Sequence, residues 1–260
     1  FILLFWGTFS VNAQNRSIRF LDDNWNIVLK KAERTGKLIF VDCYTSWCGP
    51  CQTLAKEVFT LDSVADFFNR HFLCVKLDIE KGKGLELKKP FEIRAYPTLL
   101  FLDGKQQVVH RIVGCDGAEY LMKEAGKALD PQLNFRAMQE RYMAGERATD
   151  FILEYLNYLG HAYLEEEANA IALQYLQGFK EEELITSANW KIIEKYIKDP
   201  LAIPLQVVMK RRKAFFDLAP EQEVINKLNL TCRSALLPFT RWRPDSEIVF
   251  DERYYDALVA

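Results

Sequence analysis

Apolar and polar residues follow one pattern in the first half of the chain and another in the second. Up to about residue 130, short apolar runs that predict buried strands alternate with segments of helical periodicity, in which apolar residues recur every three or four positions. The predicted strands are 38–43, 72–79, 99–102 and 108–113. Asp103-Gly104 between the last two is a hairpin signal. The predicted order, α-β-α-β-α-β-β-α, favours a mixed central sheet with helices on both faces.

From residue 131 onward the chain shows helical stripes and no convincing strand. Apolar residues at helical spacing predict several helices of about 10–18 residues, which Pro200, Pro204 and Pro220 separate. This predicts an all-α region built as a bundle or an α-solenoid, although the sequence has no fixed repeat. We therefore predict an α/β domain at 14–130, a boundary at Asp130-Pro131 and a helical domain at 131–260.

The chain opens on an apolar run. Phe1–Phe9 is too short to span a bilayer, and Val11-Asn12-Ala13 places small residues at the −3 and −1 positions of a cleavage site. This predicts a secretory signal peptide at 1–13 and a periplasmic location; a buried N-terminal strand is the alternative. No cysteine follows the run, so a lipid anchor is not supported. Because the first residue is Phe and Tyr254–Ala260 reads as the start of a helix, we expect the natural chain to extend beyond both ends.

Composition narrows the functional classes. Of the 260 residues, 49% are hydrophobic and 27% are charged, which is typical of a globular protein with one or two domains. The 34 basic and 36 acidic residues give a net charge of −2, which offers no electrostatic support for binding nucleic acid or an anionic membrane. No later segment is long and apolar enough to cross a membrane. We expect neither nucleic acid as a partner nor membrane insertion of the mature chain.

Two cysteines stand where a predicted strand gives way to a predicted helix. Cys48 and Cys51 flank Gly49-Pro50, and Trp47 precedes them. Cys48 is expected near a helix N-terminus, where unpaired N–H groups and the helix dipole stabilise a thiolate. Such a pair can be half of a zinc site, which needs a second Cys/His pair at ligand spacing; the other cysteines and the 3 histidines are scattered. The sequence therefore favours a redox dithiol, with no metal and no other cofactor.

The stretch Trp47-Cys48-Gly49-Pro50-Cys51 resembles the active-site motif of the thioredoxin family. Further matching positions, between about residues 20 and 130, are Asp42, Lys76, Tyr96-Pro97-Thr98 and Gly114. In detail the chain is similar to exported bacterial thioredoxin-like proteins and to the thioredoxin-like domain of the transmembrane disulfide reductase. The resemblance implies a thioredoxin-like α/β fold for the first domain. Lys56 stands near the place of a kinking proline in thioredoxin, so we expect the helix after the motif to run straighter.

The resemblance also assigns roles to the dithiol and to a charged pair. Cys48 is expected to attack a substrate disulfide, and Cys51 to resolve the mixed disulfide. Asp42 is expected to accept the proton of Cys51, with a pKa that burial raises, and Lys76 on the neighbouring strand to oppose that rise. A purely structural Asp42–Lys76 ion pair is the alternative.

Substrate binding is expected around a proline. If Pro97 follows a cis bond, it turns the backbone of Tyr96 toward the dithiol, where an extended substrate can pair with it. An ordinary trans proline that opens the strand is the alternative. The dipeptide Gly49-Pro50 resembles the reducing members of the family, whereas oxidants and isomerases usually carry a histidine there. The expected substrate-binding residues are Trp47, Gly49, Pro50, Tyr96, Pro97 and Gly114.

These assignments predict an exported thiol-disulfide oxidoreductase that reduces protein or peptide disulfides. Such an enzyme needs a thiol electron donor, which can be membrane-bound. Two alternatives stay open: a partner-binding scaffold that uses the helical domain, and a disulfide oxidase or isomerase with the same residues. Of the other cysteines, Cys43 and Cys74 are expected to be buried and inert, and Cys115 to be reachable on a loop that faces the active site. Cys232 has no assigned role.

Overall fold

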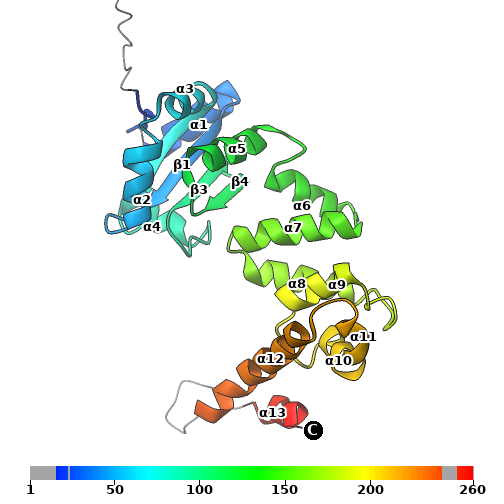
Figure 1. The fold of residues 1–260 in the computed structure, drawn as a ribbon. Coiled ribbons are helices and arrows are strands. Elements are labelled where there is room, and N and C mark those ends of the chain that lie inside the picture. Colours follow the sequence, from blue (N-terminus) through cyan, green and yellow to red (C-terminus); the bar gives the residue numbers. More distant parts are fainter. Residues whose placement is uncertain (1–15, 23, 242–250, 260) are drawn as a thin grey trace, which may run out of the picture. The chain divides into compact units, whose positions relative to one another are not determined.

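The computed structural model of the chain describes residues 16–22, 24–241 and 251–259 (Figure 1). The predicted signal peptide, residues 1–13, lies outside the described residues. The chain divides into two compact units, Phe1–Met143 and Ala144–Ala260. No helix in the described ranges is long and apolar enough to cross a membrane.

The first unit is built on a four-stranded mixed sheet, as the sequence predicts. β1 runs parallel to β2 and antiparallel to β3, and β3 runs antiparallel to β4. The order across the sheet is β2-β1-β3-β4, so β1 is an interior strand between β2 and β3. The turn that follows β1 therefore begins at one end of the sheet, next to these two strands. The strands are β1 (Leu38–Tyr44), β2 (Phe72–Asp78), β3 (Thr98–Leu102) and β4 (Val108–Val113).

Two apolar cores lie on opposite faces of this sheet. In β1, Ile39 and Val41 face one core and Phe40 faces the other, as the two-residue period of a strand requires. Helix α1 and the segment from α4 to Ile93 pack on the first face, and η1, α3 and α5 pack on the second. Helices on both faces confirm the predicted architecture. Their bounds are α1 (Trp25–Thr35), α2 (Gly49–Thr53), the π-helical turn η1 (Leu54–Val58), α3 (Asp62–His71), α4 (Gly82–Lys88) and α5 (Gly117–Leu129).

The first unit extends one helix further than the predicted boundary at Asp130-Pro131. Helix α6 (Phe135–Met143) belongs to it. The backbone N–H of Phe135 donates to Nδ1 of His110 in β4 at 3.3 Å, and His110 is completely buried. The start of α6 is thus anchored on an edge strand of the sheet.

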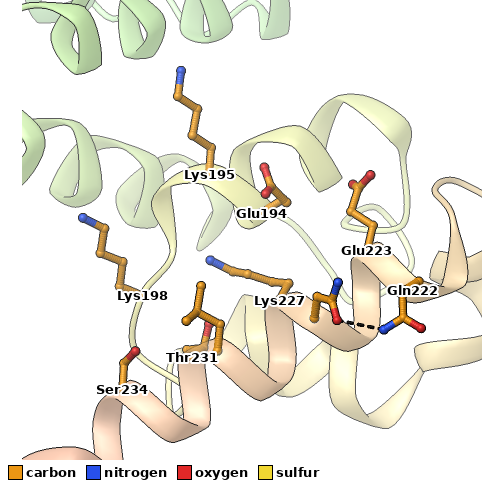
Figure 2. A pocket seen from close by; sticks show the side chains of 10 residues that line it. Glu194, Lys195, Lys198, Gln222, Glu223, Lys227, Thr231 and Ser234 are labelled. Atoms are coloured by element: carbon orange, nitrogen blue, oxygen red, sulfur yellow. Dashed lines mark hydrogen bonds between the residues drawn. The ribbon is translucent and has the colours of Figure 1, made fainter.

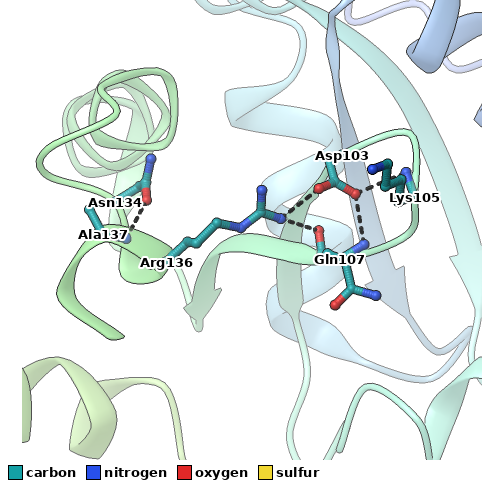
Figure 3. Close-up of polar contacts among 6 residues, drawn as sticks. All are labelled: Asp103, Lys105, Gln107, Asn134, Arg136 and Ala137. Carbon is teal, nitrogen blue, oxygen red and sulfur yellow. Dashed lines mark hydrogen bonds and ion pairs between the residues drawn. The ribbon is translucent and has the colours of Figure 1, made fainter. Parts of the chain in front are cut away.

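A second anchor joins α6 to the hairpin between β3 and β4. Nη2 of Arg136 lies 2.7 Å from Oδ2 of Asp103 and donates to the carbonyl of Gln107 at 3.3 Å, as Figure 3 shows. Oδ1 of Asn134 accepts the N–H of Ala137 at 2.9 Å and so satisfies one of the free donors at the helix start. The two Arg136 contacts join residues 33 and 29 positions apart, so the local pattern that placed the boundary at Asp130-Pro131 could not detect them.

The second unit is all-α in the part that the structure describes, which confirms the prediction. Pro204 lies in the first turn of α10 and Pro220 directly precedes α12, positions that proline tolerates because it has no N–H to contribute. Trp190 and Phe215 pack with their ring centroids 5.8 Å apart. The helices are α7 (Thr149–His161), α8 (Glu165–Leu176), α9 (Ser187–Tyr196), α10 (Ile203–Lys210), α11 (Arg212–Phe216), α12 (Glu221–Arg241) and α13 (Glu252–Val259).

Candidate active site

A disulfide joins Cys48 and Cys51 directly after β1. Cys48 is the N-cap of α2, and its sulfur accepts the N–H of Cys51 at 3.2 Å. Pro50 lies in the first helical turn, where the missing N–H costs nothing. Both cysteines are only 4% exposed, whereas the adjacent Trp47 is 65% exposed. In the reduced form, the helix N-terminus would stabilise a thiolate at Cys48, because the Cys51 N–H points toward that sulfur.

The helix after the motif is not a regular α-helix. α2 ends at Thr53 and continues as the π-helical turn η1, in which Phe59 N–H donates to the Leu54 carbonyl at 3.0 Å. The sequence led us to expect a straighter helix, because Lys56 stands near the position of a kinking proline. The expectation is wrong: a π turn interrupts the helix where no proline does. Leu54 and Val58 both point into the core through this turn.

A buried carboxylate lies on β1, six residues before Cys48. Asp42 is 1% exposed and is aligned with Lys76 across the parallel pair β1–β2. The Lys76 ammonium lies 3.5 Å from Oδ2 of Asp42, and Oδ1 has no hydrogen-bond partner. Burial raises the pKa of Asp42 to about 6, and Lys76 opposes the rise. A carboxylate with this pKa can exchange a proton near neutral pH, which suits a proton acceptor.

Three aromatic rings surround the Lys76 ammonium, and the sequence analysis did not foresee them. The centroids of Phe20, Tyr44 and Phe59 lie 5.1, 5.0 and 5.9 Å from Nζ. These distances are within the range of cation–π attraction. Phe20 reaches the site because its backbone forms an isolated parallel bridge with Cys74 in β2. We call these three rings the aromatic cage.

The predicted substrate-binding residues meet at the same end of the sheet. The peptide bond between Tyr96 and Pro97 is cis, as the resemblance implies. The ring of Tyr96 meets that of Trp47 edge-on, with centroids 5.8 Å apart. Gly114 donates its N–H to the Pro97 carbonyl at 2.9 Å, and its φ of 73° lies in the left-handed region that favours glycine. Trp47 thus contacts Tyr96, and Pro97 contacts Gly114.

Glu80 is a part of this surface that the sequence analysis missed. The indole Nε1 of Trp47 donates to both carboxylate oxygens of Glu80, at 2.9 and 3.0 Å. This bond fixes the orientation of a ring that is otherwise largely exposed. A carboxylate two residues after a strand has no sequence signature of its own. Its contact with Trp47, 33 positions away, becomes visible only in the fold.

Three of the other cysteines, Cys43, Cys74 and Cys115, have thiols whose pKa is raised by burial. Burial raises the pKa of Cys43 far above its ordinary value and that of Cys74 to about 12. Cys115 is half-buried, donates to the Gly117 carbonyl at 3.4 Å, and has a pKa of about 11, chiefly because of burial. It is therefore a poor nucleophile in this state. No group of three or more potential metal ligands occurs in the described ranges.

The helical unit has a pocket of about 770 Å³ between the end of α9 and α12 (Figure 2). Nζ of Lys227 donates to the Ile197 carbonyl at 2.6 Å, and burial lowers the pKa of this lysine to about 8. Glu223 accepts the indole N–H of Trp190 at 2.8 Å. No cysteine lines the pocket, so it offers no group for thiol chemistry.

Known proteins are similar to part of this chain. A family model described as Thioredoxin-like matches residues 21–104. Thioredoxin H-type 1 of Nicotiana tabacum is 34% identical over 100 residues, which are 37% of this chain and 71% of that thioredoxin. Thioredoxin H-type of Fagopyrum esculentum is 36% identical over 101 residues, 39% of this chain and 81% of that protein. A solution structure of a proposed disulphide-isomerase from Bacteroides thetaiotaomicron is 47% identical and covers 45% of this chain and 98% of its own, with a TM-score of 0.42.

The disulfide at a helix N-terminus and the mixed sheet define a thioredoxin-like oxidoreductase. The chain belongs to the thioredoxin family, because two thioredoxins more than 30% identical to it are matched over more than two thirds of their own length. It is a thiol-disulfide oxidoreductase of that family, and Cys48–Cys51 is its redox pair.

Proposed function

We propose that this protein is an exported reductase of protein disulfides. The observation that carries the proposal is the Cys48–Cys51 pair at the helix N-terminus that follows the strand holding the buried carboxylate of Asp42. The dipeptide Gly49-Pro50 resembles that of reducing family members, which supports reduction as the direction. The apolar run and cleavage pattern of residues 1–13 support export to a periplasm.

Reduction proceeds in two exchanges. The Cys48 thiolate attacks one sulfur of the substrate disulfide; that S–S bond breaks, a Cys48–substrate disulfide forms, and the other substrate sulfur leaves as a thiolate. Cys51 then gives its proton to Asp42 and attacks the Cys48 sulfur. The Cys48–Cys51 disulfide forms and the second substrate thiolate leaves. Two electrons pass from the dithiol to the substrate.

The substrate is an extended segment of a protein or peptide that lies against Tyr96 and Pro97. An extended segment can pair with the backbone next to Pro97 through main-chain hydrogen bonds, which do not depend on its side chains. The exposed ring of Trp47 provides an apolar contact beside the reacting sulfur. This arrangement suits an enzyme that accepts many disulfides.

A thiol donor must restore the dithiol after each turnover, because the second exchange leaves Cys48–Cys51 oxidised. In an oxidising compartment free thiols are scarce, so electrons have to arrive from a dedicated dithiol. A membrane-bound donor would provide them by the same exchange run in reverse on Cys48. We expect this donor to dock on the surface that binds substrate.

The test is turnover of the insulin disulfides with dithiothreitol as donor. Cys48→Ser should abolish turnover, and Cys51→Ser should accumulate a mixed disulfide that gel electrophoresis detects without reductant. Cys232→Ser is the matched control, because Cys232 lies in the helical unit, and it should leave turnover unchanged. Equal turnover by the parent chain and by Cys48→Ser would contradict the proposal.

A further inference from the structure

A lysine-rich segment borders the redox site on one side. Between Glu80 and Lys89 the chain carries four lysines. Two of them are neutralised locally: Lys81 pairs with Asp78 at 3.2 Å, and Lys83 pairs with Glu86 at 2.6 Å. Lys88 and Lys89, at the end of α4, form no ion pair with any residue that the structure describes.

Lys88 is linked to the redox motif through two aromatic rings. Its Nζ lies 5.7 Å from the centroid of the Tyr96 ring, and that ring meets Trp47 edge-on. The pKa of Lys88 is raised by its hydrogen bond to Tyr96 and by the nearby Glu80, so the ammonium stays charged at every physiological pH. A substrate segment that lies against Tyr96 therefore passes close to a fixed positive charge.

The opposite flank of the site carries the opposite charge. In the sheet order β2-β1-β3-β4, Lys88 belongs to the chain that follows β2, whereas Asp116 and Glu119 follow β4. Both carboxylates are exposed, just past Gly114. Glu80 also lies on the lysine side, and its carboxylate keeps its negative charge while it accepts the Trp47 indole N–H. It offsets one of the two lysines that form no ion pair with a described residue, so the lysine side keeps a net positive charge. One side of a bound peptide thus lies near the lysines that follow β2, and its other side lies near the carboxylates that follow β4.

We infer that Lys88, with Lys89 beside it, makes this oxidoreductase prefer disulfides that carry an acidic side chain on the flank that lies against Tyr96. The inference rests on the proposed function and names its substrate class. Exposed charge pairs contribute little individually, so the expected preference is about 1.5-fold to fivefold in rate. It should fade as salt is added, because the Debye length falls from about 30 Å at 0.01 M to about 8 Å at 0.15 M.

The test uses four peptides, each closed into a ring by one disulfide. They differ only in one residue: Asp or Lys stands on either the N-terminal or the C-terminal side of one of the two cysteines. Rates of reduction by the dithiol form are measured at 0.01 and 0.15 M salt. On one flank, and not on the other, Asp should be favoured over Lys. Lys88→Glu should reverse that preference, Lys88→Met should remove most of it, and Lys88→Arg should keep it.

The matched control is Lys105→Met, since Lys105 is an exposed lysine in the hairpin at the far end of β3 from Pro97, and it should leave the preference unchanged. Equal rates for Asp and Lys on both flanks at low salt, or a preference that Lys88→Glu does not alter, would overturn the inference while the proposed function stands. If the protein reduces none of the four peptides, the proposed function fails and the inference fails with it.

Discussion

The Lys76 ammonium lies 3.5 Å from Oδ2 of Asp42, while Oδ1 of the same buried carboxylate accepts no hydrogen bond. The pair is therefore asymmetric: Oδ2 faces the ammonium, whereas Oδ1 is buried and faces no donor from the part of the protein that the structure describes. Burial raises the pKa of Asp42 to about 6 in spite of Lys76. A carboxylate with this pKa can take up a proton near neutral pH, which supports the proposed role of Asp42 as proton acceptor.

Asp42→Asn should stabilise the oxidised protein at neutral pH. The pKa of Asp42 is about 6 in the folded state, against an ordinary value of 3.8. Between these two pH values the folded protein therefore binds more protons than the unfolded chain does. As a result, the free energy of unfolding falls as the pH rises from about 4 to about 6. At pH 7.5 the substitution should raise the free energy of unfolding by up to about 3 kcal/mol, and by much less at pH 4. Urea unfolding at both pH values measures this. A variant that is no more stable at pH 7.5 would refute the buried-carboxylate account.

Lys76→Met should move the pH dependence of the resolving step to higher pH. The step needs Asp42 as a carboxylate, so its rate should rise with pH around about 6. Loss of the ammonium removes the influence that lowers the pKa of Asp42, so the midpoint should increase. Stopped-flow tryptophan fluorescence of the reduced protein mixed with a model disulfide would follow the step. Lys76→Arg should bring the midpoint back toward the parent value, and an unchanged midpoint in Lys76→Met would exclude the assigned role of Lys76.

The aromatic cage should tune the same carboxylate. Phe20→Leu removes one ring from the Lys76 ammonium and should lower the free energy of unfolding by about 1–2 kcal/mol, from lost packing and cation–π attraction. It should also raise the pKa of Asp42, since Lys76 is held less firmly. Carbon-13 NMR titration of the Asp42 carboxyl group measures the pKa.

Phe67→Leu is the control for the cage. Phe67 packs on Phe68 and Phe72 near the same core, and no contact joins it to the Lys76 ammonium. It should destabilise the protein without moving the Asp42 titration. The same shift in both variants would mean that general loosening of the core, and not the cage, sets the pKa.

Helix α6 should be required for full stability of the first unit. A chain that ends at residue 130 loses the Phe135 N–H bond to His110 and the burial of Phe135, whereas a chain that ends at residue 143 keeps both. The shorter chain should be less stable by about 3 kcal/mol or more, the scale of one deleted buried phenylalanine. Urea midpoints of the two chains provide the comparison. Equal midpoints would place the boundary back at Asp130-Pro131.

The sequence pattern predicts those features of this protein that depend on residues close together in the chain. The strands follow from apolar runs, and the Cys48–Cys51 pair follows from spacing at a strand-to-helix junction. Glu80 contacts Trp47 across 33 positions and Phe20 contacts Lys76 across 56, and a local pattern cannot detect contacts at such separations. The π turn after Thr53 was missed for a related reason, because proline is only one of several causes of an irregular helix.

The reduction potential of the Cys48–Cys51 pair tests the central claim most directly. The protein is equilibrated in graded thiol buffers and alkylated, and the free thiols at these two positions are counted by mass spectrometry. The account predicts a value near that of thioredoxin, roughly −270 mV, where the dithiol donates electrons to protein disulfides. A value of roughly −120 to −180 mV would make the protein an oxidase or isomerase and would contradict the proposed reductase.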